Sequence, residues 1–184
     1  MPALGPNRYI RAVVGGWTAS ALLQYSSGVL IAVPSAQNNL SSLLFRGTLS
    51  NRVPGQPLFL VDPNSSIDPN KQFFLNPKAW SDPAAGQWGF SAPYYDDYRW
   101  RRTPWEQGDI GRLFPLRERM TLEFKLEFQN VFNRPLYSAP SASNALSTQV
   151  MNALGVPTSG FGYINVSSGT SGSRRGELVV RLQF

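Results

Sequence analysis

Apolar and polar residues alternate in two segments near the end of the chain, strictly in the first and with Val179 as the exception in the second, with the two-residue period of a β-strand. Residues 121–129 read TLEFKLEFQ, and residues 177–184 read ELVVRLQF. A helix would spread these apolar residues around its whole circumference. The apolar faces of the two predicted strands carry Leu122, Phe124, Leu126, Phe128, Leu178, Val180, Leu182 and Phe184. The opposite faces carry Glu123, Lys125, Glu127 and Arg181.

Two more strands are predicted upstream of these segments. Residues 17–26, WTASALLQYS, place Trp17 and Tyr25 on one apolar face, eight residues apart. Residues 109–114 form a shorter strand, in which Arg112 interrupts the apolar positions. The chain therefore predicts an all-β fold of antiparallel strands.

The connections between these strands alternate in length. A tight turn at residues 115–118 leads into the strand at 121–129, whereas residues 27–108 and 133–174 form long connections rich in Pro, Gly, Asn and Ser. Only residues 142–154 contain enough helix formers for one or two turns of helix.

The amino-acid composition excludes several kinds of functional site. The 184 residues include no Cys and no His, which excludes disulfides, thiolate zinc sites, cysteine nucleophiles, His-based metal sites and Ser-His-Asp triads. The net charge is +6, but the basic residues are dispersed and form no nucleic-acid-binding motif, so we expect no nucleic-acid partner. Charged residues make up only 15% of the chain, which is low for a soluble domain.

Alternating strands occur in soluble sandwiches and in transmembrane β-barrels, which differ in what the apolar face meets. Three features favour the barrel. Long connections alternate with a short turn, as in outer-membrane barrels. Trp17 and Tyr25 lie about 19 Å apart along the membrane normal in a strand tilted by about 45°, as two aromatic girdles would. The chain also ends with Phe184 on an alternating strand.

Four segments resemble the C-terminal part of TonB-dependent outer-membrane receptors, in particular the Oar-like β-barrel family. They are GGWTASALLQYSSGVLIAV (15–33), FFLNPKAWSDPAAGQWGFSA (73–92), FPLRERMTLEFKLEFQNVFNRPLYSAP (114–140) and GSRRGELVVRLQF (172–184). The third is the most specific, because a tight turn, an alternating strand and an Asn-Arg-Pro exit occur together.

The resemblance implies that residues 1–184 are the C-terminal barrel segment of a receptor in the outer membrane, with the plug and most of the barrel absent. The whole receptor would import a bulky ligand through a barrel of about 22 strands, without catalysis or cofactor. Its partners would be outer-membrane lipid, the remaining strands and plug, the barrel-assembly machinery, and the TonB complex through the missing N-terminal parts. Phe184 would be the terminal assembly signal at the periplasmic end, so that both long connections are external.

The candidate ligand contacts lie in one aromatic and charged segment. They are Tyr94, Tyr95, Asp96, Asp97, Tyr98, Arg99 and Trp100. Such residues can bind a sugar or a peptide by ring stacking and charged hydrogen bonds. Alternatively, the aromatic rings pack the loop against itself. Asp62–Asp68 has the alternate oxygen side chains of a calcium loop but lacks its Gly and Glu, so a Pro-rich turn explains it better. Nothing fixes the geometry that catalysis by Asp96 and Asp97 would need.

Two other functions remain open at this point. A soluble β-sandwich would bind carbohydrate through residues 94–105. A short oligomeric pore would pool the strands of several copies, because four or five strands are fewer than the eight of the smallest barrels.

Overall fold

The computed structural model of the protein describes residues 15–44 and 46–184, which form two compact units. The sheet unit contains the described residues up to Tyr25, together with Pro104–Pro135 and Gly172–Phe184. The loop unit contains the described residues of Ser26–Thr103 and Leu136–Ser171. Among the described residues, no helix is long and apolar enough to cross a bilayer.

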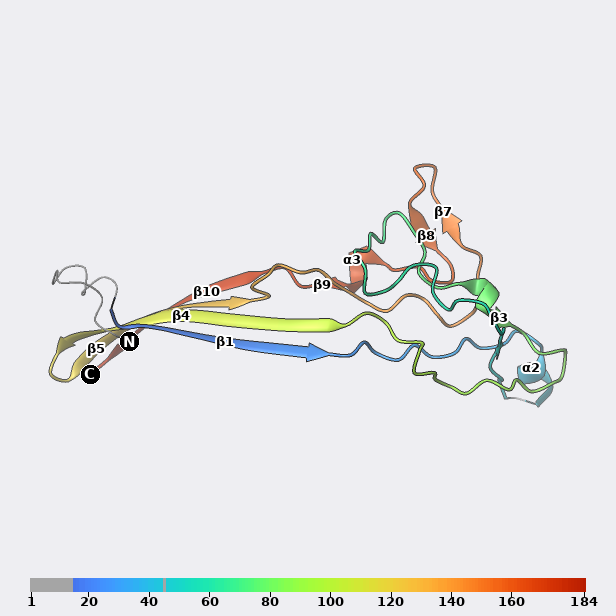
Figure 1. Cartoon of the computed structure of the whole chain (residues 1–184), viewed down its shortest axis with the longest axis horizontal. Coiled ribbons are helices and arrows are strands. Elements are labelled where there is room, and N and C mark those ends of the chain that lie inside the picture. Colours follow the sequence, from blue (N-terminus) through green and yellow to red (C-terminus); the bar gives the residue numbers. More distant parts are fainter. Residues whose placement is uncertain (1–14, 45) are drawn as a thin grey trace. The chain divides into compact units, whose positions relative to one another are not determined.

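The sheet unit is built on a four-stranded sheet in the order β1-β4-β5-β10 (Figure 1). The strands are β1 (Trp17–Ser26), β4 (Thr103–Arg117), β5 (Met120–Gln129) and β10 (Arg175–Gln183). β5 pairs antiparallel with β4 on one side and with β10 on the other. The predicted all-β antiparallel fold is confirmed, and three of the predicted strands lie within two residues of their observed bounds.

β4 is longer than the predicted strand 109–114, and the tight turn predicted at 115–118 is wrong in position. Pairing continues through Pro115 and Arg117, so the turn consists of Glu118 and Arg119. A register shift between Pro115 and Arg117 explains the difference. Proline lacks the N–H that a ladder needs, and a bulge lets the strand continue past it.

The loop unit contains short elements joined by irregular chain. The helical elements are α2 (Leu40–Leu44), η1 (Pro77–Ala79) and α3 (Val166–Gly169). The strands are β2 (Asn51–Arg52), β3 (Trp80–Ser81), β6 (Leu136–Tyr137), β7 (Val150–Met151), β8 (Pro157–Ser159) and β9 (Thr170–Ser171). They form three two-stranded sheets, in which β2 pairs with β3, β6 with β9, and β7 with β8.

The helical turns predicted in residues 142–154 are not formed. This stretch contains the strand β7, which pairs with β8 across a tight connection. The side-chain oxygen of Asn152 accepts the backbone N–H of Leu154 at 2.9 Å and that of Val156 at 3.0 Å. Such local side-chain bonds compete with helix formation, which accounts for the difference.

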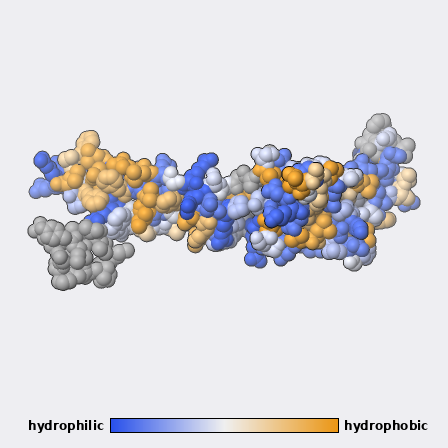
Figure 2. Space-filling view, turned by 90° about the horizontal axis from the view of Figure 1, so that it is seen from above, coloured by the Kyte–Doolittle hydropathy of each residue, from blue (hydrophilic) through white to orange (hydrophobic). Residues whose placement is uncertain are grey.

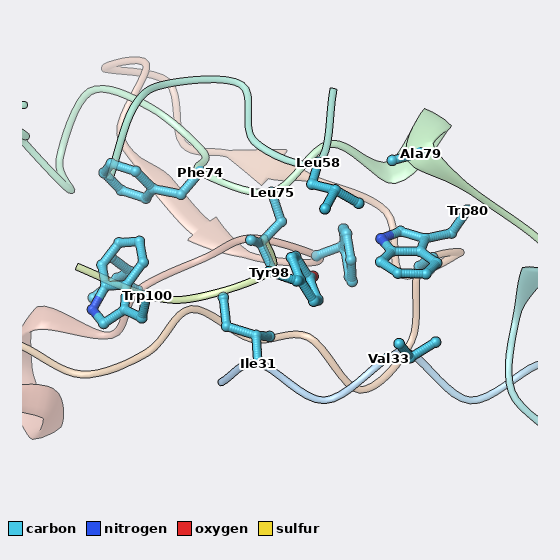
Figure 3. Packing of buried hydrophobic residues seen from close by; sticks show 12 residues of the cluster. Ile31, Val33, Leu58, Phe74, Leu75, Ala79, Trp80, Tyr98 and Trp100 are labelled. Atoms are coloured by element: carbon cyan, nitrogen blue, oxygen red, sulfur yellow. The ribbon is translucent and has the colours of Figure 1, made fainter. Parts of the chain in front are cut away.

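The core of the loop unit is aromatic (Figure 3). Tyr98 and Phe74 are fully buried. The ring of Tyr98 lies 5.3 Å from that of Trp80 and 5.6 Å from that of Phe59, and Phe74 meets Trp100 edge-on at 5.5 Å. The remaining buried members of the cluster are Ile31, Val33, Leu58, Leu75, Ala79, Ala145, Phe161 and Ile164. A core of this kind gives the long connections a defined structure.

The first prediction concerns Tyr98 at the centre of this core. Burial raises the pKa of its phenol, and its hydroxyl makes no hydrogen bond of normal geometry with the described residues. Tyr98→Ala should lower the free energy of unfolding of the loop unit by about 3–5 kcal/mol, whereas Tyr98→Phe should leave it unchanged or raise it. Thermal unfolding of the full chain, followed by near-ultraviolet circular dichroism, measures both.

Phe90 provides the control, because its side chain is 92% exposed. Phe90→Ala should change the stability by no more than about 0.5 kcal/mol. Equal losses from Tyr98→Ala and Phe90→Ala would contradict the packing described here.

Candidate functional site

One face of the sheet is apolar, and no second layer of the described residues covers it. The strand register aligns its side chains in rows that cross β4, β5 and β10: Phe114–Leu122–Leu182, Ile110–Leu126–Leu178 and Gly108–Phe128–Gly176. Phe124 remains 39% exposed, Val180 53% and Leu178 64%. Hydrophobic side chains gather at the end of the sheet that holds the C-terminus (Figure 2). The predicted apolar face is confirmed, and exposed apolar surface of this extent marks an interaction surface.

A cation lies within this apolar face, in the row Arg112–Phe124–Val180. Cζ of Arg112 is 4.6 Å from the ring centroid of Phe114 and 5.6 Å from that of Trp17. Phe114 in turn meets Phe124 edge-on at 5.7 Å. The ring faces attract the guanidinium electrostatically. Sequence reasoning identified Arg112 only as an interruption, because Trp17 is far from it along the chain.

Phe128 lies between two glycines in its row. A Cβ added to Gly176 would meet the Phe128 ring at 3.1 Å, and one added to Gly108 would meet Cγ2 of Val131 at 3.3 Å. The ring of Phe128 therefore covers β10 at Gly176, which has no side chain. Aromatic residues beside glycines cover the neighbouring strand in the same way in other sheets.

An ionic group follows immediately beyond that row. Glu106 is buried, and its Oε1 accepts a hydrogen bond of 2.9 Å from the hydroxyl of Tyr25. Nη1 of Arg134 lies 3.6 Å from the same oxygen. The burial of a carboxylate is tolerable here because it is both hydrogen-bonded and paired. No sequence pattern indicates this group, since Tyr25, Glu106 and Arg134 are brought together only by the fold.

The opposite face of the sheet is polar and carries ion pairs. Nζ of Lys125 lies 2.8 Å from Glu127 and 3.6 Å from Asp109, while Arg181 lies 3.6 Å from its cross-strand partner Glu123. The predicted shared face of Glu123, Lys125, Glu127 and Arg181 is confirmed. A shallow pocket of about 270 Å³ opens on this face between β1, β4 and β5, and Ser20 and Gln129 are among its lining residues.

The predicted ligand contacts divide into exposed and buried residues. Tyr94 is 54% exposed. Asp97 pairs with Arg52 at 2.6 Å, and Asp96 pairs with Arg99 at 3.3 Å. Tyr95 is half-buried under the guanidinium of Arg52, whose Cζ lies 5.1 Å from the ring centroid.

Tyr98 and Trp100 are not surface residues, so their prediction as ligand contacts is wrong. Tyr98 is fully buried and Trp100 is 4% exposed. The indole N–H of Trp100 donates to the carbonyl oxygen of Tyr137 at 3.1 Å. In this extended segment the alternate residues face the core, and the rings are large enough to form most of it.

Phe184 lies one residue beyond the end of β10 and is 95% exposed. Its side chain is therefore available for contact with another molecule, and its role as an assembly signal stays a prediction.

The Asp62–Asp68 segment is organised by local bonds. Oδ1 of Asp62 accepts the N–H of Asn64 at 2.9 Å, and Nζ of Lys71 lies 3.1 Å from Asp68. The hydrogen bond from Lys71, reinforced by the N–H of Asn70, lowers the pKa of Asp68. Within the described residues, no group of three or more carboxylates is placed to hold a metal ion.

Comparison with known proteins agrees with this arrangement of two unlike faces. A family model described as "Outer membrane beta barrel domain" matches residues 2–177. Neither a curated protein nor a solved structure matches the chain. The family match covers nearly the whole sequence and places the protein in the outer membrane. The chain therefore belongs to the outer membrane beta barrel domain family.

Proposed function

We propose that the chain supplies the C-terminal strands and two external connections of a TonB-dependent receptor of the Oar-like type, which imports a bulky ligand. The observation that carries this proposal is the apolar face of the sheet, which no second layer of described residues covers. In a barrel this face meets lipid, and the polar face with its ion pairs lines the hydrated interior.

The exposed face favours the barrel over the soluble sandwich. A sandwich buries its apolar face against a second sheet. The other sheets among the described residues have two strands each and belong to the loop unit, which has a core of its own. A carbohydrate-binding sandwich therefore has no observation in its favour beyond the exposed Tyr94.

The lengths of the connections between the strands indicate which end of the sheet is periplasmic and which is external. β4 and β5 are joined by two residues, whereas long connections link β1 to β4 and β5 to β10. Outer-membrane barrels have short periplasmic turns and long external loops. The turn Glu118–Arg119 and Phe184 thus belong at the periplasmic end, and the loop unit is external.

The proposed partners follow from this placement. Lipid meets the apolar face, while further strands and a plug complete the barrel, since four strands are fewer than the eight of the smallest barrels. The assembly machinery reads Phe184, and the TonB complex acts through the plug side of the receptor. The role is transport, without catalysis and without nucleic acid. Tyr94, Asp96, Asp97 and Arg99 remain the candidate ligand contacts on the exposed surface.

The second prediction compares one leucine on each face of the sheet. Leu178 on the apolar face is 64% exposed, and Leu113 on the polar face is 52% exposed. Leu178→Lys should destabilise the chain in phospholipid vesicles by about 2–4 kcal/mol, whereas Leu113→Lys, which faces Glu123, should cost much less. Urea titration of the vesicle-bound chain measures both changes.

In a soluble sandwich or any other water-exposed sheet, the two substitutions would have similar and small effects. That result, or a parent chain that does not bind vesicles, would contradict the proposal.

The third prediction concerns Phe184 as the assembly signal. Phe184→Ser should reduce the amount of protein assembled in the outer membrane of a Gram-negative host, because the machinery would lose its terminal aromatic residue. The same variant should bind vesicles as the parent does in the absence of that machinery. Fractionation of cells and vesicle flotation measure the two quantities.

Phe90→Ser is the matched control, since Phe90 is 92% exposed in the loop unit. Unchanged assembly of the Phe184→Ser variant in cells would refute the assigned role.

A further inference from the structure

A polar rim closes the apolar face at the end opposite to Phe184. It lies two residues beyond the last apolar row, Gly108–Phe128–Gly176, at Glu106 in β4 and at Asn130 and Arg174, which lie just outside β5 and β10. The rim is completed by Tyr25 and Arg134, both in contact with other rim residues. In the orientation proposed above, this is the external boundary of the lipid-facing surface.

Two asparagines of the turn after β5 bind the backbone of both rim arginines. Oδ1 of Asn130 accepts the backbone N–H of Arg134 at 2.9 Å, and Oδ1 of Asn133 accepts that of Arg174 at 3.2 Å. Nδ2 of Asn130 also donates to the carbonyl oxygen of Gly172. Both asparagines have positive φ, 51° and 52°, a conformation that Asn tolerates better than most residues. The turn therefore holds the segment that leads into β10, residues 172–174, beside Asn130 and Asn133.

The guanidinium of Arg134 is directed by its neighbours on the apolar side of the sheet. It pairs with Glu106, whose side chain is only 1% exposed, and its Cζ lies 5.3 Å from the ring centroid of Phe132. Glu106 is in turn held by Tyr25. The side chain of Arg134 is still 52% exposed.

Both arginines keep donors for another molecule. A guanidinium has five N–H donors, and the pair with Glu106 is the one polar contact that the described residues provide for that of Arg134. Arg174 is exposed, and the described residues provide no ion pair for its side chain. With Glu106 as the rim's single carboxylate, the rim carries one net positive charge.

We propose that this rim binds the phosphate-bearing headgroup of a lipid in the outer leaflet. Arginine is well suited to phosphate because its planar donors match the phosphate oxygens. The rim continues directly from the apolar face, so the acyl chains lie along that face while the headgroup reaches the arginines. The exposed rings of Tyr25 and Phe132 lie at the level where aromatic girdles meet headgroups. The inference rests on the proposed function, which supplies the lipid contact and the orientation.

The test uses the full chain in detergent with phosphatidic acid, phosphatidylglycerol or diacylglycerol, and counts the retained lipids by native mass spectrometry. The parent should retain phosphatidic acid most strongly. The double variant Arg134→Gln/Arg174→Gln should lose about tenfold or more of that retention. The matched control is Arg117→Gln/Arg119→Gln, which removes two exposed arginines beside the other turn.

Equal retention of the three lipids by the parent, or an equal loss in the control variant, would overturn the inference. Complete displacement of phosphatidic acid by inorganic phosphate would show a site for the free anion instead, and would also overturn it. Flotation with neutral phosphatidylcholine vesicles distinguishes a failure of the rim proposal from a failure of the proposed membrane-facing sheet. A chain that floats but shows no phosphate preference refutes the rim alone, whereas a chain that does not float refutes the membrane-facing sheet as well.

Discussion

The antiparallel hydrogen-bonded ladder, with side chains on alternate faces, is the constraint on which the rest of the sheet unit depends. In hydrocarbon every backbone N–H and C=O must be paired within the protein, and a sheet does this while presenting two unlike surfaces. The register aligns Leu122 with Leu182 on one surface and Glu123 with Arg181 on the other. A slip of one residue would exchange the faces and expose charges to lipid, so the apolar pattern and the pairing enforce each other.

Charged side chains have different surroundings on the two faces of the sheet. On the polar face Lys125, Glu127 and Asp109 form pairs near water, where each pair contributes little to stability. On the apolar face the two ionic groups are covered by rings or partners. Arg112 lies against aromatic rings, and Glu106 is buried beneath Tyr25 and Arg134. Each charge is thus accommodated where it would otherwise be most costly.

The sequence predicted what depends on local periodicity and missed what depends on distant partners. The strand at 121–129 was predictable because its alternation is strict, and Arg112 made the strand at 109–114 look shorter than β4 is. For Tyr98 and Trp100 the sequence left two alternatives, a ligand site and a loop packed against itself, because aromatic residues in a charged segment fit both. Only the packing of Phe59, Phe74 and Trp80 against them decides between these alternatives.

The glycines on either side of Phe128 bear on how the sheet bends. Cβ atoms on neighbouring strands resist close approach, and positions without them are where strands coil most sharply in closed barrels. Gly108 and Gly176 lie at the same level of the sheet, so β4 and β10 lack this resistance at one height. This height is therefore where β4 and β10 offer the least resistance to bending, and the ring of Phe128 lies beside the open position at Gly176.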